Sequence, residues 1–191
     1  MDLIERRYPV TQPRSRKVSY AISDPFLRFW FRFVSPRESR LHTRAGAERY
    51  LRDGVLPGLD KFVSEDAWER VCQQWTLDQR SDVVDVGRWW GSIRRTEEGE
   101  LRSRRYEADV AAVDESGAVV ALGSCRWADG TTAEHRHPGA ELRKLEVIRE
   151  ELDAPGASLL CFDRVGFSPQ LEEAARNRRD VELVHVAGMG R

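Results

Sequence analysis

The sequence predicts a mixed α/β fold in which a sheet is flanked by helices and preceded by a helical N-terminal extension. Three strand-like segments follow one another between residues 83 and 127. The later strand-like segments, 158–162 and 181–186, each follow a segment with helical spacing of apolar residues. Strands joined by a helix pair in parallel, whereas hairpin strands pair antiparallel. From residue 64 onward the predicted order is therefore α-β-β-β-α-β-α-β.

The centre of the predicted sheet is a hairpin over residues 106–127. Two apolar arms flank a short polar turn that ends in glycine, which is a local signal for antiparallel pairing. Glu107 and Asp109 lie near the outer end of one arm, and Ser124 and Arg126 near the outer end of the other. Residues two apart share a face of a strand. We therefore expect two carboxylates to face a hydroxyl and a guanidinium across neighbouring strands.

The N-terminal part begins with an expected edge hairpin over residues 1–23. Ser23 or Asp24 is positioned to cap a helix that starts at Pro25. The segment Phe26–Val34 carries aromatic residues at helical spacing. This spacing is typical of a core-facing helix, and the alternative is an aromatic surface that binds a partner protein.

Two more helices are expected before the first long strand. One covers residues 38–52 and is expected to end at Gly54. The other begins at Ser64 as its cap, with two acidic residues in its first turn, where the helix dipole favours negative charge. Glu69 lies beside the apolar stripe of this second helix rather than opposite to it.

Length and composition limit the class of protein. A chain of 191 residues fits one domain, or one domain with an appendage. Its three cysteines form no Cys-x-x-Cys pair, so we expect free, buried thiols in a cytoplasmic protein. No apolar run reaches the ~20 residues that a bilayer requires, so we expect no membrane partner. No glycine-rich loop precedes a lysine, and we therefore expect no ATP binding.

Positive charge is concentrated near the N-terminus and is almost all arginine. Residues 1–52 hold twelve lysines and arginines against five acidic residues, and the whole chain has only three lysines. A second basic group, interleaved with tryptophan, is a candidate nucleic-acid surface of stacking and phosphate-binding residues. Its members are Arg88, Trp89, Trp90, Arg94 and Arg95. The alternative is that one tryptophan packs under the sheet and the arginines are solvated.

The predicted order and several motifs resemble a known family. The α-β-β-β-α-β core is similar to restriction-endonuclease-like, PD-(D/E)xK domains. The segment 20–36, the run Val86–Trp90, the Glu-x-Asp of Glu107 and Asp109, and Gly166–Ser168 resemble the C-terminal nuclease-like domain of archaeal-type AAA+ ATPases. By this resemblance, residues 1–23 look like the remnant of a winged-helix wing. Residues 24–191 then form the nuclease-like domain, with a helical part over 24–62.

The resemblance implies a divalent-metal site for phosphodiester cleavage, in which carboxylates bind Mg²⁺ and a lysine positions water. The family's ligand positions fall on Glu69, Asp109 and Ser124, and its lysine position falls on Arg126. A neutral hydroxyl at Ser124 removes a ligand, and a guanidinium does not deprotonate. We therefore expect a degenerate, inactive site in a module that binds DNA or a protein partner and needs no cofactor.

Two other functions stay open. Glu107 is a candidate replacement ligand, and with Asp109 and Glu69 it would give a weakly active Mg²⁺- or Mn²⁺-dependent endonuclease. Alternatively, the aromatic segment Phe26–Val34 docks an ATPase module supplied by another chain. The pair His135 and His137 is more typical of a loop than of half a metal site, because no ligands lie near it at zinc spacing.

Overall fold

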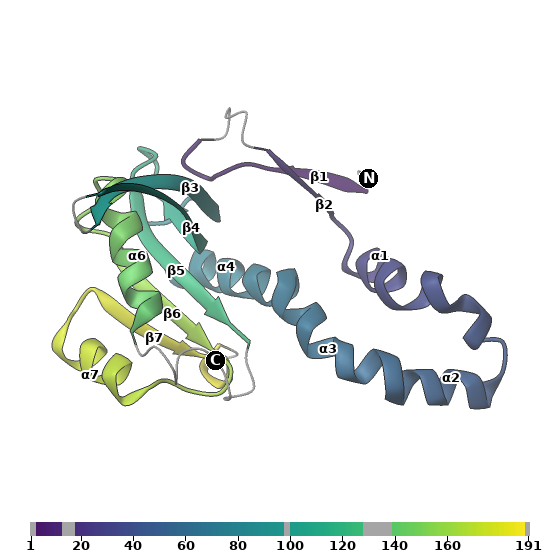
Figure 1. The fold of residues 1–191 in the computed structure, drawn as a ribbon. Helices are drawn as coiled ribbons and strands as arrows, with labels where there is room; N and C mark the ends of the chain where they lie inside the picture. The colour runs from purple at the N-terminus through teal and green to yellow at the C-terminus, as the bar shows by residue number, and fades with distance from the viewer. Residues whose placement is uncertain (1–2, 13–17, 98–99, 128–138, 190–191) are drawn as a thin grey trace.

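The computed structural model describes residues 3–12, 18–97, 100–127 and 139–189. One five-stranded sheet, in the order β3-β4-β5-β6-β7, forms the body of the molecule, and a two-stranded sheet of β1 and β2 stands apart from it (Figure 1). In the large sheet β3, β4 and β5 are antiparallel, whereas β5, β6 and β7 are parallel. The predicted mixed sheet and the predicted element order are thereby confirmed.

The strands are β1 (Ile4–Arg7), β2 (Ser19–Ile22), β3 (Asp85–Glu97), β4 (Glu100–Val113), β5 (Val119–Arg126), β6 (Ser158–Asp163) and β7 (Val181–His185). The α-helices are α1 (Pro25–Phe29), α2 (Arg44–Tyr50), α3 (Leu56–Phe62), α4 (Trp68–Gln79), α6 (Ala140–Glu151) and α7 (Pro169–Asn177). Short π-helical segments cover Trp30–Val34, Leu51–Val55 and Val63–Ala67, and 3-10 turns cover Ser35–Arg40 and Val186–Gly188.

Two hydrophobic cores lie on opposite faces of the sheet. On one face α6 and α7 pack through Leu145, Ile148 and Leu171. On the other face α4 packs through Trp68 and Cys72. Alternate sheet residues face alternate cores, as the period of two requires. The body is therefore a three-layer α/β/α arrangement.

Several local signals act as the sequence predicts. The Asp24 side chain accepts hydrogen bonds from the first amides of α1, which begins at Pro25. Ser168 caps α7 by accepting from the amide of Leu171. In the β4–β5 turn Gly117 has φ of 81°, a conformation that favours glycine. The three cysteines are free, and Cys72 and Cys161 are buried whereas Cys125 is half-buried.

The predicted boundaries at Gly54 and Ser64 are wrong. A single helical run continues from Arg44 to Gln79 through α2, α3 and α4 and the two π-helical segments between them. The residues at the internal junctions keep right-handed helical dihedrals. The run also starts later than predicted, because Thr43 caps it by accepting from the amide of Gly46 at 3.1 Å.

Packing explains why neither local signal ends the helix. A Cβ on Gly54 would lie 2.3 Å from the Tyr50 ring, so glycine makes room for a side chain one turn earlier. The Tyr50 hydroxyl in turn donates to the carbonyl of Phe33 at 2.8 Å. Ser64 donates its hydroxyl to the carbonyl of Lys61, which is how serine behaves inside a helix rather than at a cap.

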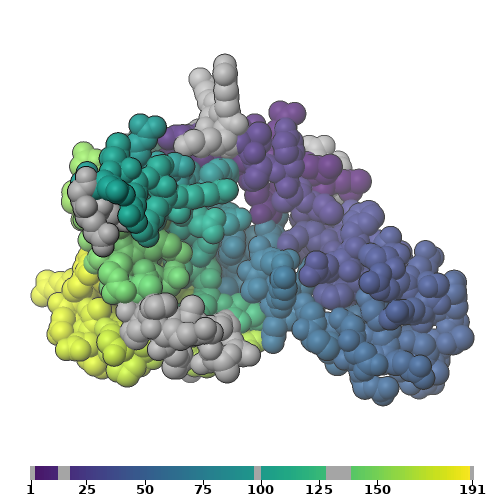
Figure 2. All heavy atoms as spheres, in the orientation of Figure 1, coloured from purple at the N-terminus to yellow at the C-terminus, as the bar shows by residue number. Residues whose placement is uncertain are grey.

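The helical extension forms a lobe beside the sheet body, and the β1–β2 hairpin lies above both (Figure 2). Asp66, whose side chain is 5% exposed, joins these parts through ion pairs with three arginines. Arg7 comes from β1, Arg28 from α1 and Arg70 from α4 itself. We call these four residues the Asp66 cluster. Within the described ranges, no helix has the length and apolar character to cross a bilayer.

Candidate functional site

A β-bulge in β4 positions Asp109. Gly87 pairs with Ala111 and Trp89 pairs with Ala108, so two residues of β4, Asp109 and Val110, stand opposite Arg88 alone. Bulges of this kind change the direction of side chains and interrupt regular pairing. The side chains of β4 were expected to alternate strictly between the two faces of the sheet. At Asp109 and Val110 the bulge interrupts this alternation.

Asp109 and Ser124 are the residues just beyond the last paired residues of β4 and β5, which are Val110 and Gly123. Just beyond this pair, a carboxylate oxygen of Asp109 accepts a hydrogen bond from the amide of Cys125 at 2.8 Å. Burial raises the pKa of Asp109, although the Cys125 amide and the positive charge of Lys144 act in the opposite direction.

Ser124 belongs to a buried polar network that the sequence did not indicate. Its hydroxyl donates to a carboxylate oxygen of Glu141 at 2.8 Å, and the same oxygen lies 2.7 Å from the Lys144 ammonium. Burial alone would raise the pKa of Glu141, but Lys144 and Ser124 lower it overall. The signal available in the sequence was the i,i+3 pair of Glu141 and Lys144 at the start of the helix after β5. Lys144 is one of only three lysines in the chain.

Arg126 is directed to the end of the neighbouring strand. Its guanidinium lies 3.4 Å from a carboxylate oxygen of Asp163, which is buried at the end of β6. The other carboxylate oxygen of Asp163 accepts from the amides of Val165 and Gly166. Arg126 is thus held at the end of β5 by an acidic residue at the end of the adjacent strand β6.

Glu69 and Glu107 meet Arg88 rather than each other. The Arg88 guanidinium lies 3.3 Å from Glu69 and 3.6 Å from Glu107. Burial raises the pKa of Glu69 to about 7, Arg88 opposes the shift, and Asp109 adds to it. Across the described parts of the chain, no group of three or more His, Cys, Asp or Glu side chains is arranged to hold a metal ion. His135 and His137 lie outside the described residues.

The basic and aromatic residues of β3 are divided between the two faces of the hairpin. Trp89 is 5% exposed and packs in the core under α6, so its ring is not available for stacking on a base. Arg95 points to the same side, where it pairs with Glu150 of α6. Trp90 and Arg94 lie on the opposite face, where Trp90 reaches the rim of a pocket.

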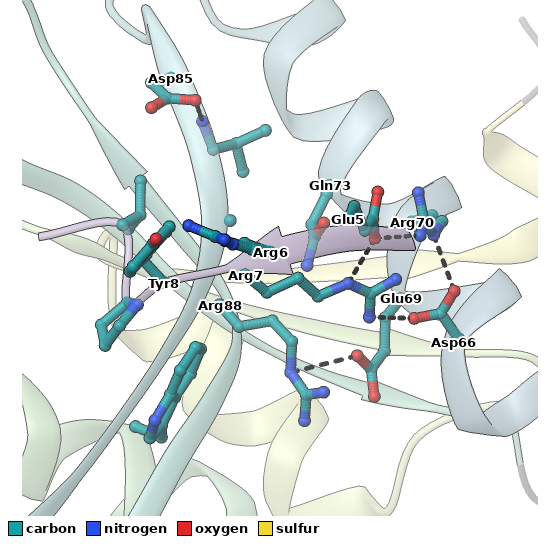
Figure 3. Close-up of a pocket in the computed structure, with 15 residues that line it drawn as sticks. Glu5, Arg6, Arg7, Tyr8, Asp66, Glu69, Arg70, Gln73, Asp85 and Arg88 are labelled. Atoms are coloured by element: carbon teal, nitrogen blue, oxygen red, sulfur yellow. Dashed lines mark hydrogen bonds and ion pairs between the residues drawn. The ribbon is translucent and has the colours of Figure 1, made fainter. Parts of the chain in front are cut away.

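This pocket has a volume of about 350 Å³ and lies between β1 and the residues that follow it, α4 and the start of β3 (Figure 3). Glu69 and Arg88 contribute to its lining, and so do Asp66, Arg7 and Arg70 of the Asp66 cluster. The amide of Val10 donates to the carbonyl of Arg88 at 3.0 Å, which attaches the N-terminal segment to β3. No signal in the sequence predicts this pocket, because two of its walls, β1 and α4, are about sixty residues apart in the chain.

One family model matches residues 30–137, that of DUF234, described as archaea bacterial proteins of unknown function. The chain belongs to the DUF234 family. A search of curated proteins and a search of solved structures each found no match. The DUF234 match includes Glu69, Asp109 and Ser124, and it ends before Glu141 and Lys144.

Proposed function

We propose that this DUF234 chain is a nuclease-like domain, related to the C-terminal part of archaeal-type AAA+ ATPases, that binds nucleic acid without cleaving it. The observation that carries the proposal is the face of the β3–β4 hairpin that bears Trp90, Arg94 and Arg105. Directly paired residues share a face. Arg94 pairs with Ser103 and Arg105 pairs with Ser92, so the two arginines are diagonal neighbours on this face.

Both arginines are exposed, and neither forms an ion pair with another described residue. Guanidinium groups without carboxylate partners are available to phosphates, and neutralising phosphates releases condensed counterions. Trp90 lies on the same face and offers a partly exposed ring. A basic surface with an aromatic side chain is suited to a single strand, which presents both phosphates and unpaired bases.

The residues at the expected metal site do not fit a divalent-cation cage. Glu69 and Glu107 are both paired with Arg88. The Ser124 hydroxyl donates a hydrogen bond to Glu141. A hard cation prefers charged oxygen ligands that converge on one point. These contacts support binding rather than metal-dependent hydrolysis as the function of the domain.

Fluorescence anisotropy with labelled single-stranded and duplex DNA and with RNA tests the proposal. We expect Arg94→Gln with Arg105→Gln to weaken binding and to lower the slope of log affinity against log salt by about 1 to 2. Arg95→Gln is the matched control, because Arg95 lies on the other face and pairs with Glu150. Equal affinity in the double variant and the wild-type chain would contradict the proposal.

A nicking assay with Mg²⁺ or Mn²⁺ separates binding from cleavage. We expect no product from the wild-type chain. Metal-dependent nicking that disappears in Asp109→Ala would instead support the active endonuclease. In that assay Ser124→Glu combined with Arg126→Lys restores the family's ligand pattern and measures how far the site is from activity.

A second candidate function is a docking platform for an ATPase module, and the exposed aromatic residues of the extension favour it. Phe26 is 66% exposed and Phe31 is 56% exposed, whereas Phe33 packs inside the lobe. Analytical ultracentrifugation with a purified AAA+ ATPase module from the same genome tests this function. Association that is lost in Phe26→Ser with Phe31→Ser would support docking, and the absence of a complex would reject it.

A further inference from the structure

The pocket beside Arg88 lies at one end of the basic hairpin face. A single strand of nucleic acid that follows this face from Arg94 toward Arg88 reaches the N-terminal segment. This segment is attached to β3 by the hydrogen bond from the Val10 amide to the Arg88 carbonyl. This bond places the N-terminal segment beside the hairpin face at Arg88. We therefore expect a polymer that follows the face to end or turn away at this point.

The size of the pocket suits one nucleotide. Its volume of about 350 Å³ lies at the lower end of the range for small-molecule sites, roughly 300–1,000 Å³. A mononucleotide is a ligand of this size, whereas a base-paired duplex is far too wide. Tyr8 and Trp90 both line the pocket, and aromatic rings stack on nucleobases of any sequence.

Two of the four arginines that line the pocket, Arg7 and Arg70, are held by hydrogen-bonded ion pairs with Asp66 and Glu5 (Figure 3). Arg6 has no ion pair with any described residue; its guanidinium lies 6.0 Å from the ring of Tyr20.

Arg88 is held more loosely than Arg7 and Arg70. Its contacts with Glu69 and Glu107, at 3.3 and 3.6 Å, are longer than the 2.7–2.9 Å typical of a charge-assisted hydrogen bond. Its buried Nε atom makes the contact with Glu69, and neither this nitrogen nor the Glu69 oxygen that it meets has hydrogen-bond geometry to a described residue.

We propose that the pocket binds the terminal phosphorylated nucleotide of a single strand, with Arg88 and Arg6 on the phosphate and Trp90 against the base. This inference rests on the proposed nucleic-acid binding and names the form of the ligand: a phosphorylated single-stranded end. Internal phosphates of the same strand then bind Arg94 and Arg105 along the hairpin.

The test compares labelled twelve-nucleotide oligothymidylates with a 5′-phosphate, a 3′-phosphate or neither, at fixed ionic strength and pH 6.5. With the full chain we expect one terminal phosphate to tighten binding about tenfold. Arg88→Gln should abolish this difference. Arg6→Gln, at an exposed position of β1, should reduce it without risk to folding.

The outcomes separate this inference from the proposed function. Equal affinity for phosphorylated and unphosphorylated strands, with salt-dependent binding that still requires Arg94 and Arg105, would overturn the inference alone. The absence of binding to every oligonucleotide would overturn both. A preference for the phosphorylated end that survives in Arg88→Gln and Arg6→Gln would also overturn the inference, because the phosphate would then bind elsewhere.

Discussion

Asp66→Asn should destabilise the chain strongly, because it leaves three arginines without their shared carboxylate. The Asp66 side chain is 5% exposed, and the side chains of Arg28, Arg7 and Arg70 are 17%, 20% and 36% exposed. Removing one partner of a buried ion pair costs roughly 3–5 kcal/mol. Since these arginines keep part of their hydration, we expect a loss at the lower end, about 3 kcal/mol.

Urea unfolding followed by tryptophan fluorescence measures this loss. With a urea dependence of roughly 2–3 kcal/mol per molar, the midpoint should fall by about 1–1.5 M. The control is Glu65→Gln on the same helical run, since its contact with Lys61 at 3.9 Å is exposed and should contribute under about 0.5 kcal/mol. Because the Asp66 cluster joins β1 and α1 to α4, amide exchange should accelerate first in the β1–β2 hairpin.

The dependence on pH has a definite sign. Burial would raise the pKa of Asp66, but hydrogen bonds from Arg7 and Arg70 lower it overall. A carboxyl with a lowered folded-state pKa stabilises the protein above its unfolded value, near 4, and this contribution is lost as the pH falls. Asp66→Asn should therefore flatten the acid limb of the stability curve. If the variant unfolded at the same urea concentration as Glu65→Gln, the structural role of the cluster would be refuted.

Three further outcomes are expected. Gly54→Ala should destabilise the helical run by about 1 kcal/mol despite the better helix propensity of alanine, and in a Tyr50→Ala background, where no ring crowds the new Cβ, thermal unfolding should show a gain instead. The folded-state pKa of Glu69, about 7, lies above its unfolded value, so the wild-type chain should lose up to about 3 kcal/mol of stability as the pH rises from 4.5 to 7. Glu69→Gln should remove this loss, and equal pH profiles of the two proteins would contradict the assignment. Burial raises the pKa of Cys161 to about 12 and raises that of Cys125 too, so thiol titration with Ellman's reagent should show slow labelling at both until the protein unfolds.

The sequence by itself determined the elements whose signals are local. These signals act through hydrogen bonds or dihedral preferences within a few residues. They are Asp24 before Pro25, Ser168 before Pro169 and the turn that ends at Gly117. The order of strands and helices follows from the period of apolar residues. The pairing of the strands that carry Asp109 and Ser124 follows from the hairpin signal alone.

Features that depend on distant segments become visible only in the folded chain. Gly54 does not end its helix, because Tyr50 fills the space beside it and is anchored to Phe33. The bulge at Asp109 is a property of strand pairing, which no single strand displays in its sequence. Glu141 reaches Ser124 from another element, and the pocket beside Arg88 has walls from the β1 segment, the α4 part of the helical run and the start of β3. Periodicity gives the face of each element, whereas the partner that covers this face depends on packing of the whole chain.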